Sequence, residues 1–274
     1  MKKFEGILIC TDLDGTLLQD DKSVSREDRE AIEYFKSEGG AFTLVTGRLP
    51  YFIGDIVEKV RPNAPLGCGN GEAVYDFSAG KYLHTVTLDR SALELVDYVM
   101  ERIEGMGMHI NTYEEIFFCC ENEAMATFRR LTGMPNTVCD YKTYEGEIAK
   151  IVFGDTREEA IQLLDKLLTT HERANEFDFI RSERTLYEIL PKGTNKGSAL
   201  IKIAEILGID RKNTIAVGDY FNDIPMIKEA GVGIAVANAR TLVKEAADMV
   251  TVSNRENAIA KIIEGLDRGE IIKI

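Results

Sequence analysis

The stretch GILICTDLDGTLLQD, residues 6–20, decides how the chain is expected to fold. Its first half is apolar and predicts a buried β-strand, which we place over residues 4–11. The strand runs directly into Asp12, and Asp14 and Gly15 follow at once. Carboxylates this close together repel each other unless a cation lies among them. The first question is therefore why a hydrophobic strand ends in two aspartates and a glycine.

The composition excludes several classes of protein. The chain has 274 residues, of which 45% are hydrophobic, which is ordinary for a globular protein of one large or two average domains. Its net charge of −13 argues against nucleic-acid binding, which needs a basic surface, but it leaves a small anionic substrate possible. The apolar run near the N-terminus is short and ends in aspartates, so we expect no signal peptide.

Other absences concern membranes and disulfides. No apolar stretch approaches the ~20 residues that cross a bilayer, so we expect no membrane partner. The five cysteines are odd in number and show no metal-binding spacing. We interpret them as reduced thiols of a cytoplasmic protein.

The order of the expected elements gives the fold class. Short apolar strands alternate with amphipathic helices at both ends of the chain, as in the helix that begins after Ser25, and this alternation predicts a parallel sheet covered by helices. Between these parts the strands come in pairs, which favours an antiparallel sheet. We therefore expect an α/β, Rossmann-like core over residues 1–82 and 186–274, with an α+β domain over residues 83–185 inserted into it.

Polar residues gather where three of the strands end. Ligands bind at the carboxyl ends of the strands in open α/β sheets, and a parallel sheet brings these ends to one edge. Lys196 begins the helix that precedes the last of these strands. The three groups are Asp12 with Asp14, Thr46-Gly47-Arg48, and Gly218-Asp219 with Asn222-Asp223.

These residue types together are typical of phosphoryl transfer. Oxygen ligands without His or Cys suit Mg²⁺, and a lysine and a hydroxyl neutralise and bind phosphate oxygens. One aspartate can attack phosphorus, and a second can protonate the leaving oxygen and then activate water. Each motif also has an ordinary interpretation: an Asx turn at Asp12–Asp14, a solvated lysine at 196, a helix cap and first-turn acid at Asp219 and Asp223. Their occurrence in order, at strand ends, favours the functional interpretation.

Four motifs resemble those of the haloacid dehalogenase superfamily of phosphohydrolases. They are DLDGTLL at 12–18, VTGR at 45–48, KGTNKGSAL at 192–200 and GDYFNDIPMI at 218–227. The insertion resembles the large α/β cap of the Cof-like subgroup, and GNGE at 69–72 resembles the NGA segment that precedes that cap. Two positions depart from the pattern. Glu72 replaces the usual small residue, so the local wall of the pocket is expected to differ from that of the family, and Asn257 stands where glycine is common.

The resemblance implies a role for each motif residue. Asp12 would be the nucleophile and Asp14 the general acid and base. Asp12, the Asp14 backbone carbonyl and Asp219 would bind Mg²⁺, and Asp223 would orient a ligand water or the lysine. The residues implied to bind or surround the phosphate are Thr46, Gly47, Asn70, Lys196 and Asn222.

The resemblance also implies the class of function. We expect a Mg²⁺-dependent phosphatase of small phosphorylated metabolites, with sugar phosphates as the best candidates. A phosphomutase of the phosphomannomutase type and a non-catalytic ligand sensor are the alternatives, and either a monomer or a homodimer is compatible. A cap would close over the site and choose the leaving group. Its candidate contacts, each also interpretable as an ordinary surface residue, are His109, Asn111, Arg129, Arg130, Lys142, Arg181 and Arg184.

Overall fold

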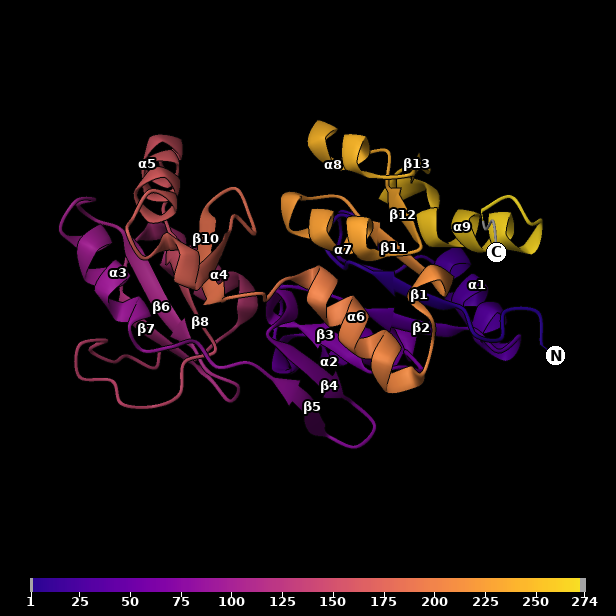
Figure 1. The fold of residues 1–274 in the computed structure, drawn as a ribbon, viewed down its shortest axis with the longest axis horizontal. Helices are drawn as coiled ribbons and strands as arrows, with labels where there is room; N and C mark the ends of the chain where they lie inside the picture. Colours follow the sequence, from indigo (N-terminus) through magenta and orange to yellow (C-terminus); the bar gives the residue numbers. More distant parts are fainter. Residues whose placement is uncertain (1, 272–274) are drawn as a thin grey trace. The chain divides into compact units, whose positions relative to one another are not determined.

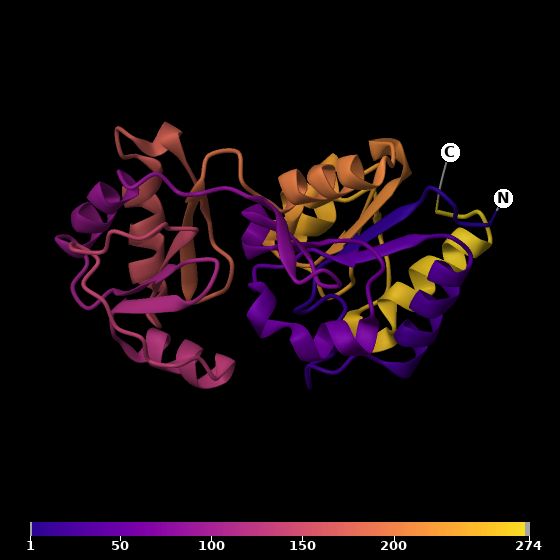
Figure 2. The same ribbon diagram turned by 90° about the horizontal axis from the view of Figure 1, so that it is seen from below.

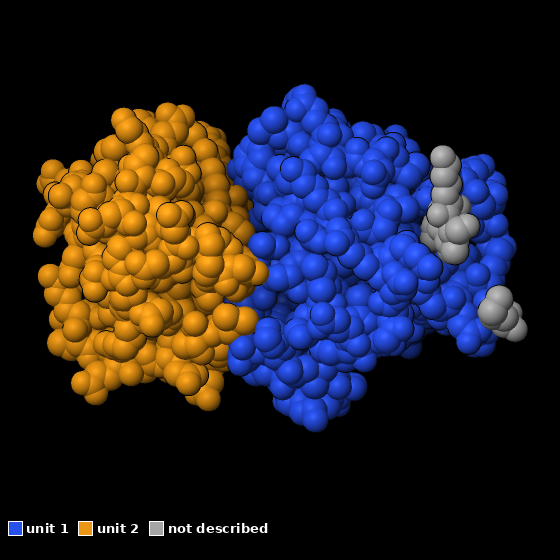
Figure 3. Space-filling view, in the orientation of Figure 1, with its two compact units in different colours: residues 1–85, 195–274 blue, residues 86–194 orange. Residues whose placement is uncertain are grey.

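The structure is a computed structural model that describes residues 2–271. The chain divides into two compact units, unit 1 of residues 1–85 and 195–274 and unit 2 of residues 86–194 (Figure 3). Unit 2 is therefore continuous in sequence and interrupts unit 1. Both junctions differ from the expected ones at 82/83 and 185/186. The strand over residues 81–85 belongs to a sheet of unit 1, and the strand over residues 186–191 belongs to the sheet of unit 2.

Unit 1 is an α/β layer structure, as its alternating pattern predicts. Its five parallel strands follow the order β13-β12-β11-β1-β2. Helices α1 and α9 lie side by side on one face of this sheet, and α6 and α7 lie on the other (Figure 2). The elements are β1 (Leu8–Thr11), α1 (Arg26–Ser37), β2 (Ala41–Leu44), α2 (Gly54–Val60), β3 (Leu66–Cys68), β4 (Ala73–Asp76), β5 (Lys81–Thr85), α6 (Lys196–Leu207), β11 (Thr214–Gly218), α7 (Ile224–Glu229), β12 (Val232–Ala235), α8 (Thr241–Ala246), β13 (Met249–Val250) and α9 (Ala258–Asp267).

The sequence accounts for these elements locally. All four residues of β1 are buried and its first three are apolar, which suits a central strand covered on both faces. Helix α1 begins where its cap was expected, because the Ser25 hydroxyl accepts a hydrogen bond from the Asp28 amide. Strand β3 lies outside the parallel sheet: it pairs with β4 in a separate three-stranded sheet with β5, and a bridge between Val45 and Gly67 links it to the end of β2.

Unit 2 is an α+β structure with one antiparallel sheet of order β7-β6-β8-β10-β9 (Figure 1). The paired strands were expected, but the last of them was assigned to the core, and this was wrong. Its six residues pair with both β8 and β9, so they belong to unit 2. The elements are α3 (Ala92–Met100), β6 (Gly107–Asn111), β7 (Ile116–Cys120), α4 (Glu123–Thr132), β8 (Lys150–Gly154), α5 (Glu158–Thr169), β9 (Phe177–Ile180) and β10 (Leu186–Pro191).

The core of unit 2 lies on one face of its sheet. Side chains of β6, β8 and β10, among them Ile110, Ile151 and Ile189, pack there with the apolar stripes of α3 and α5. All five cysteines of the chain are free thiols, and the Sγ atoms of Cys119 and Cys139 lie 3.4 Å apart. Within residues 2–271, none of the helices has both the length and the apolar character needed to span a membrane.

Candidate active site

The candidate site lies in unit 1 at the carboxyl ends of β1 and β11. The chain continues from β1 to β2 on one side and from β11 to β12 on the other, so the strand order reverses between these two neighbours, which is where open α/β sheets bind ligands. Asp12 follows β1, and its amide donates to the Val217 carbonyl at 2.9 Å. Asp219 follows β11, and Asp223 lies in the short 3₁₀ turn before α7.

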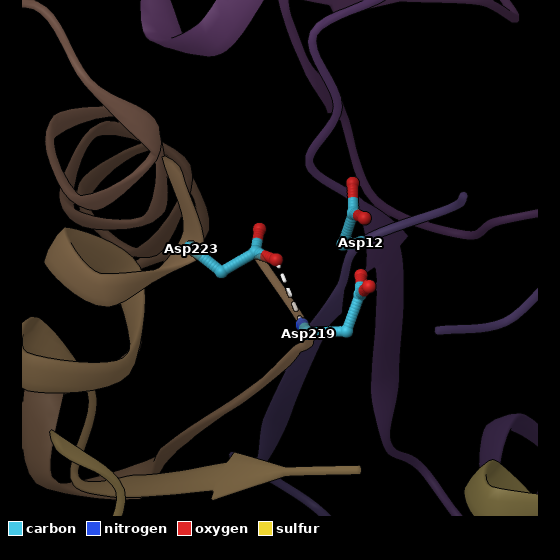
Figure 4. A group of neighbouring side chains, drawn as sticks. All are labelled: Asp12, Asp219 and Asp223. Atoms are coloured by element: carbon cyan, nitrogen blue, oxygen red, sulfur yellow. Dashed lines mark hydrogen bonds between the residues drawn. The ribbon is translucent and has the colours of Figure 1, made fainter. Parts of the chain in front are cut away.

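Three carboxylates and one ammonium meet at this point. Asp12, Asp219 and Asp223, called the acidic cluster below, each place an oxygen within 4.8 Å of the others (Figure 4). The Lys196 Nζ donates to Asp12 Oδ1 and to Asp223 Oδ1, both at 2.6 Å, and its side chain is 1% exposed. With every group ionised, one ammonium and three carboxylates leave two negative charges in a buried place.

Lys196 is held there by the start of its helix. It is the first residue of α6, and the cap before it is reciprocal: the Asn195 side chain accepts from the Ser198 amide, while the Ser198 hydroxyl accepts from the Asn195 amide. Such a capping box satisfies two otherwise unpaired donors and fixes the first turn. The sequence NKGS therefore positions the ammonium as well as starting the helix.

The backbone of the first motif is fitted closely to Asp219. Gly15 has φ of +83°, and a Cβ atom at this position would lie 2.5 Å from Asp219 Oδ2. The neighbouring Thr16 hydroxyl donates to Asp219 Oδ1 at 3.1 Å. A glycine is required here both by its left-handed backbone and by the close approach of the carboxylate.

Burial and the charges of the cluster together raise the pKa values of Asp12, Asp219 and Lys196. Burial, and then the Asp223 carboxylate, raises the pKa of Asp12 well above its usual range, and Lys196 only partly opposes this. The same two causes raise the pKa of Asp219 to about 7. Burial would lower the pKa of Lys196, but Asp12 and Asp223 outweigh it, so the pKa is raised and the ammonium stays charged. The carboxylates are thus short of positive charge.

The donor set of the cluster fits a hard divalent cation. Its ligand atoms are carboxylate oxygens, without imidazole or thiolate, which is the chemistry that Mg²⁺ prefers. A divalent cation would also balance the two excess negative charges. Asp223 is already engaged, because its Oδ2 accepts the amides of Asp219 and Tyr220 at 2.8 and 2.9 Å and its Oδ1 accepts from Lys196.

A second group of predicted residues lies together beside β2. The Asn70 amide donates to the Thr46 carbonyl at 3.0 Å, and Asn70 Oδ1 accepts from Asn222 Nδ2 at 3.0 Å. A Cβ atom on Gly47 would lie 3.0 Å from Asn70 Oδ1, so the glycine keeps this approach open. Asn70 holds a φ of +65°, which asparagine tolerates better than most residues. All four of these residues come together in unit 1, as their motifs predicted.

Asp14 takes a different position from the acidic cluster. Its carboxylate accepts two hydrogen bonds from the Arg48 guanidinium, at 2.8 and 2.7 Å, and one from Lys22 Nζ at 2.7 Å. Burial would raise the pKa of Asp14, but Arg48 and then Lys22 lower it below its ordinary value. The side chain is 37% exposed, in contrast to the buried carboxylates of Asp12 and Asp223.

Sequence reasoning missed three partners in this site. Thr16 and Arg48 stand inside recognised motifs, DLDGT and VTGR, but nothing in their spacing showed that they hold Asp219 and Asp14. Lys22 reaches Asp14 through a turn in which its own φ is +63°, and no pattern in the sequence signals this.

The seven residues expected on the inserted unit divide into three kinds. Two of the residues, Arg130 and Arg184, are exposed. Three have acidic partners on unit 2: Arg129 pairs with Glu121, Lys142 with Asp97, and Arg181 with Glu158. His109 and Asn111 are instead buried, at 1% and 4% exposure.

Comparison with known proteins places this geometry in a family. A family model described as haloacid dehalogenase-like hydrolase matches residues 9–263. The phosphatase YcsE of Bacillus subtilis, named for 5-amino-6-(5-phospho-D-ribitylamino)uracil, is 31% identical over 93% of this chain and 94% of its own.

Solved structures show the same fold. A haloacid dehalogenase-like hydrolase from Bacteroides thetaiotaomicron superposes with a TM-score of 0.79 at 26% identity, over 94% of this chain and 98% of that one. The subclass IIB sugar phosphatase BT4131 superposes with a TM-score of 0.83 over 97% of this chain and all of that one; at 21% identity it shows the fold alone. The expected fold class is therefore confirmed.

Proposed function

Because the chain belongs to the haloacid dehalogenase-like hydrolases, we propose that it is a Mg²⁺-dependent phosphatase that forms an aspartyl-phosphate intermediate. The family makes the protein a hydrolase, and the phosphatases among its relatives support phosphate monoesters as its substrates. The observation that carries the proposal is the acidic cluster with Lys196, whose excess of carboxylates suits a divalent cation and a phosphoryl group.

Asp12 is the proposed nucleophile. It stands at the end of the central strand β1, and its Oδ1 accepts a 2.6 Å bond from Lys196. The lysine favours the ionised carboxylate that attack on phosphorus requires, and it opposes the effect of burial. The attack forms an Oδ–P bond as the bond from phosphorus to the ester oxygen breaks, and water later cleaves the aspartyl phosphate to release inorganic phosphate.

Asp14 is the proposed general acid and base. It would give a proton to the departing ester oxygen and later take one from the attacking water. Hydrogen bonds from Arg48 and Lys22 hold its carboxylate at a defined position. Some of these hydrogen bonds would have to break when the carboxylate takes up a proton. Arg48 is therefore a positioning residue for Asp14.

Mg²⁺ would be held by Asp12 and Asp219 together with the backbone carbonyl of Asp14. When bound, it would neutralise charge on the phosphate oxygens. Asp223 would keep Lys196 and the Asp219 backbone in place, as its hydrogen bonds do in the structure. Thr46, Gly47, Asn70 and Asn222 would form the remaining rim around the phosphate, donating from hydroxyl, amide and backbone groups.

The proposed substrates are phosphate esters of sugars and sugar alcohols. The 31% identical relative is named for a substrate in which phosphate esterifies a ribityl chain, which is a sugar alcohol. That name and the motif resemblance both indicate a polyhydroxyl alcohol as the leaving group. We propose this class, with 5-amino-6-(5-phospho-D-ribitylamino)uracil as one member to test.

Phosphate release is the test of this function. A panel of sugar phosphates, ribityl phosphates, nucleotides and pyridoxal phosphate would be measured with Mg²⁺ and with chelator, for the wild type and for Asp12→Asn. We expect release that needs the metal and falls by about 10³-fold or more in the variant, since the nucleophile is lost. Release that survives in Asp12→Asn would contradict the mechanism. Isomerisation of a hexose phosphate that depends on a bisphosphate, with little free phosphate, would indicate the mutase instead.

A further inference from the structure

Two cysteines of unit 2 lie in contact with each other, and the proposed chemistry uses neither of them. Cys119 is on β7, which forms one edge of the sheet, and Cys139 is in the segment of residues 133–149, which joins α4 to β8. Their Sγ atoms are 3.4 Å apart, and both side chains are only partly buried. Cys10 and Cys68 of unit 1, by contrast, are 0% exposed. The cysteines of unit 2 are therefore the ones that a reagent in solution can reach.

Backbone pairing brings the two thiols together. The Phe118 amide donates to the Thr137 carbonyl at 2.8 Å, and a parallel bridge pairs Phe118 with Val138. Cys119 and Cys139 are the next residues along these two stretches of chain, so they are neighbours across the bridge. Paired stretches of chain lie about 4.8 Å apart, which is within the Cα separations of about 4.4–6.8 Å found in disulfides.

The pairing of β7 with β6 is irregular at Cys119. His109 is opposite Phe118, but the adjacent Met108 is opposite Cys120, so Cys119 lies between the two pairs as an extra residue. An extra residue of this kind is released from the regular alternation of the strand, which re-aims its side chain. Here the thiol of the extra residue lies against Cys139.

A bond between the two sulfur atoms requires little movement. The sulfur atoms of a disulfide are about 2.05 Å apart, so two sulfur atoms at 3.4 Å each have to move by about 0.7 Å. A rotation about each Cα–Cβ bond moves a sulfur atom on this scale while the backbone stays paired. The two cysteines are free thiols in the structure, and they are already positioned for a disulfide.

We propose that Cys119 and Cys139 are a redox modification site, which reacts with a small disulfide such as oxidised glutathione and forms a reversible disulfide bond within unit 2. The Cys139 thiolate attacks one sulfur of the small disulfide, whose S–S bond breaks and releases one small thiolate. The Cys119 thiolate then attacks the Cys139 sulfur of the mixed disulfide and releases the second small thiolate. Two protein thiols thereby lose two electrons and two protons, and the small disulfide takes them up as two thiols.

The two thiols differ in how readily they ionise. Burial, and next Cys139, raises the pKa of Cys119. Burial also raises the pKa of Cys139, but the hydrogen bond with Cys119 lowers it, and nearby Asp140 raises it. Because the thiolate is the attacking form, the first attack is assigned to Cys139. The raised pKa values also mean that the reaction is faster in mildly alkaline solution.

The bond would fasten the segment of residues 133–149 to the edge of the sheet. In the reduced protein, the backbone bonds between this segment and β7 are the one from the Phe118 amide and a longer one, 3.4 Å, from the Cys139 amide to the Phe118 carbonyl. Segments held by few hydrogen bonds open locally at little cost in free energy, and exposed ones are then cut by proteases. Lys142 lies in this segment with a side chain that is 64% exposed, so it is a site for trypsin.

Counting thiols tests the proposal. The folded, reduced wild type is incubated with oxidised glutathione at about pH 8.5, near the ordinary pKa of a thiol, and is then unfolded, alkylated and weighed by mass spectrometry. We expect two of the five cysteines to escape alkylation and a digest to contain one peptide pair joined through Cys119 and Cys139. Dithiothreitol should restore all five. A count that stays at five, or a bond through Cys120, would overturn the proposal; this count needs no variant to fold.

Three variants and two further measurements test what the bond does. Cys119→Ser and Cys139→Ser should form no internal disulfide, whereas Cys120→Ser, the matched control at the next position, should react as the wild type does. Because the bond joins residues 20 positions apart, oxidation should raise the melting temperature of the wild type by about 5 °C or more. It should also slow trypsin cleavage after Lys142 about fivefold or more. Neither effect should occur in Cys139→Ser, and a wild type that shows neither on oxidation would contradict the proposed fastening of the segment.

Discussion

Each unit of this protein buries a lysine against carboxylates, but the two places differ in their charge balance. In unit 2, Lys150 forms an ion pair with Glu188, and the pair is neutral. In unit 1, Lys196 faces Asp12 and Asp223, and Asp219 adds a third carboxylate. Geometry does not separate them, since the N–O distances are 2.9 Å and 2.6 Å and both lysines are almost fully buried.

This difference in charge balance indicates which of the two buried groups is a candidate for cation binding and catalysis. A buried pair of equal and opposite charges needs no further ion to balance it. Hydrophobic residues of the same volume can often replace such a pair without loss of stability. A buried group with excess negative charge is incomplete, and it raises the pKa values of its own carboxylates, as at Asp12 and Asp219. Such a site attracts a cation.

Removing the lysines gives the largest expected effect. Lys196→Met and Lys150→Met should each destabilise the fold by about 3–5 kcal/mol, since buried carboxylates lose their partner. Adding Glu188→Leu to Lys150→Met should recover most of this loss, because the pair is then absent altogether. Urea unfolding with chelator measures both. If the double variant is no more stable than Lys150→Met alone, the two places do not differ as described.

Magnesium should stabilise the wild type by a smaller amount. At a concentration 100-fold above its dissociation constant, a ligand of the native state adds about 2.7 kcal/mol. We expect the melting temperature to rise with Mg²⁺ and the rise to shrink clearly in Asp219→Asn, which removes one proposed ligand. The control is Glu188→Gln, which alters the neutral place and should leave the rise intact. An equal rise in Asp219→Asn would contradict the assignment of the metal site.

The pH dependence of stability should differ in sign from that of an ordinary paired aspartate. The folded pKa of Asp219 is about 7, against an ordinary 3.8, so folding takes up a proton between these values. This contribution to stability is complete below pH 3.8 and is lost as the pH rises through about 7. In chelator, the melting temperature of the wild type should therefore fall more between about pH 5 and about pH 8 than that of Asp219→Asn. Parallel curves would exclude this proton uptake.

The smallest expected effects are at Asp14, where the partners are more exposed. Arg48→Lys replaces two parallel hydrogen bonds by one and should lower kcat about tenfold with little change in KM. Lys22→Ala removes a partner that is 63% exposed, so kcat should change by less than about twofold. A rise in KM with unchanged kcat in Arg48→Lys would instead indicate that Arg48 contacts the substrate.

Much of the fold and of the site followed from local patterns. The alternation of apolar runs and amphipathic stretches predicted the parallel sheet, and polar residues at strand ends predicted which side chains meet. Asp12, Lys196 and Asp219 come together as expected because the carboxyl ends of parallel strands share one edge. The family of the chain followed from four short motifs, and the family match confirms it.

What failed was decided by contacts that no local pattern records. The expected boundary at 185/186 assigned Leu186–Pro191 to the core, but the pairing of this strand with β8 and β9 places it in unit 2. Helix α8 was not predicted, since six residues carry little periodicity. The bonds of Arg48 and Lys22 to Asp14 depend on where two loops pass each other, and the motifs alone do not give that.

The insertion of unit 2 also sets the order in which a newly synthesised chain can acquire its parts. Strand β1 lies between β2 and β11, so one of its edges lacks its neighbour until residues 214–218 have left the ribosome. Asp12 can pair with Lys196 only after a further 184 residues have been synthesised. Residues 86–194 form a contiguous unit, so all of unit 2 is synthesised before Lys196. Closing so long a loop is slow, and an unpaired strand edge is open to wrong partners meanwhile. A nascent chain thus carries its proposed nucleophile long before it has the groups that make it one.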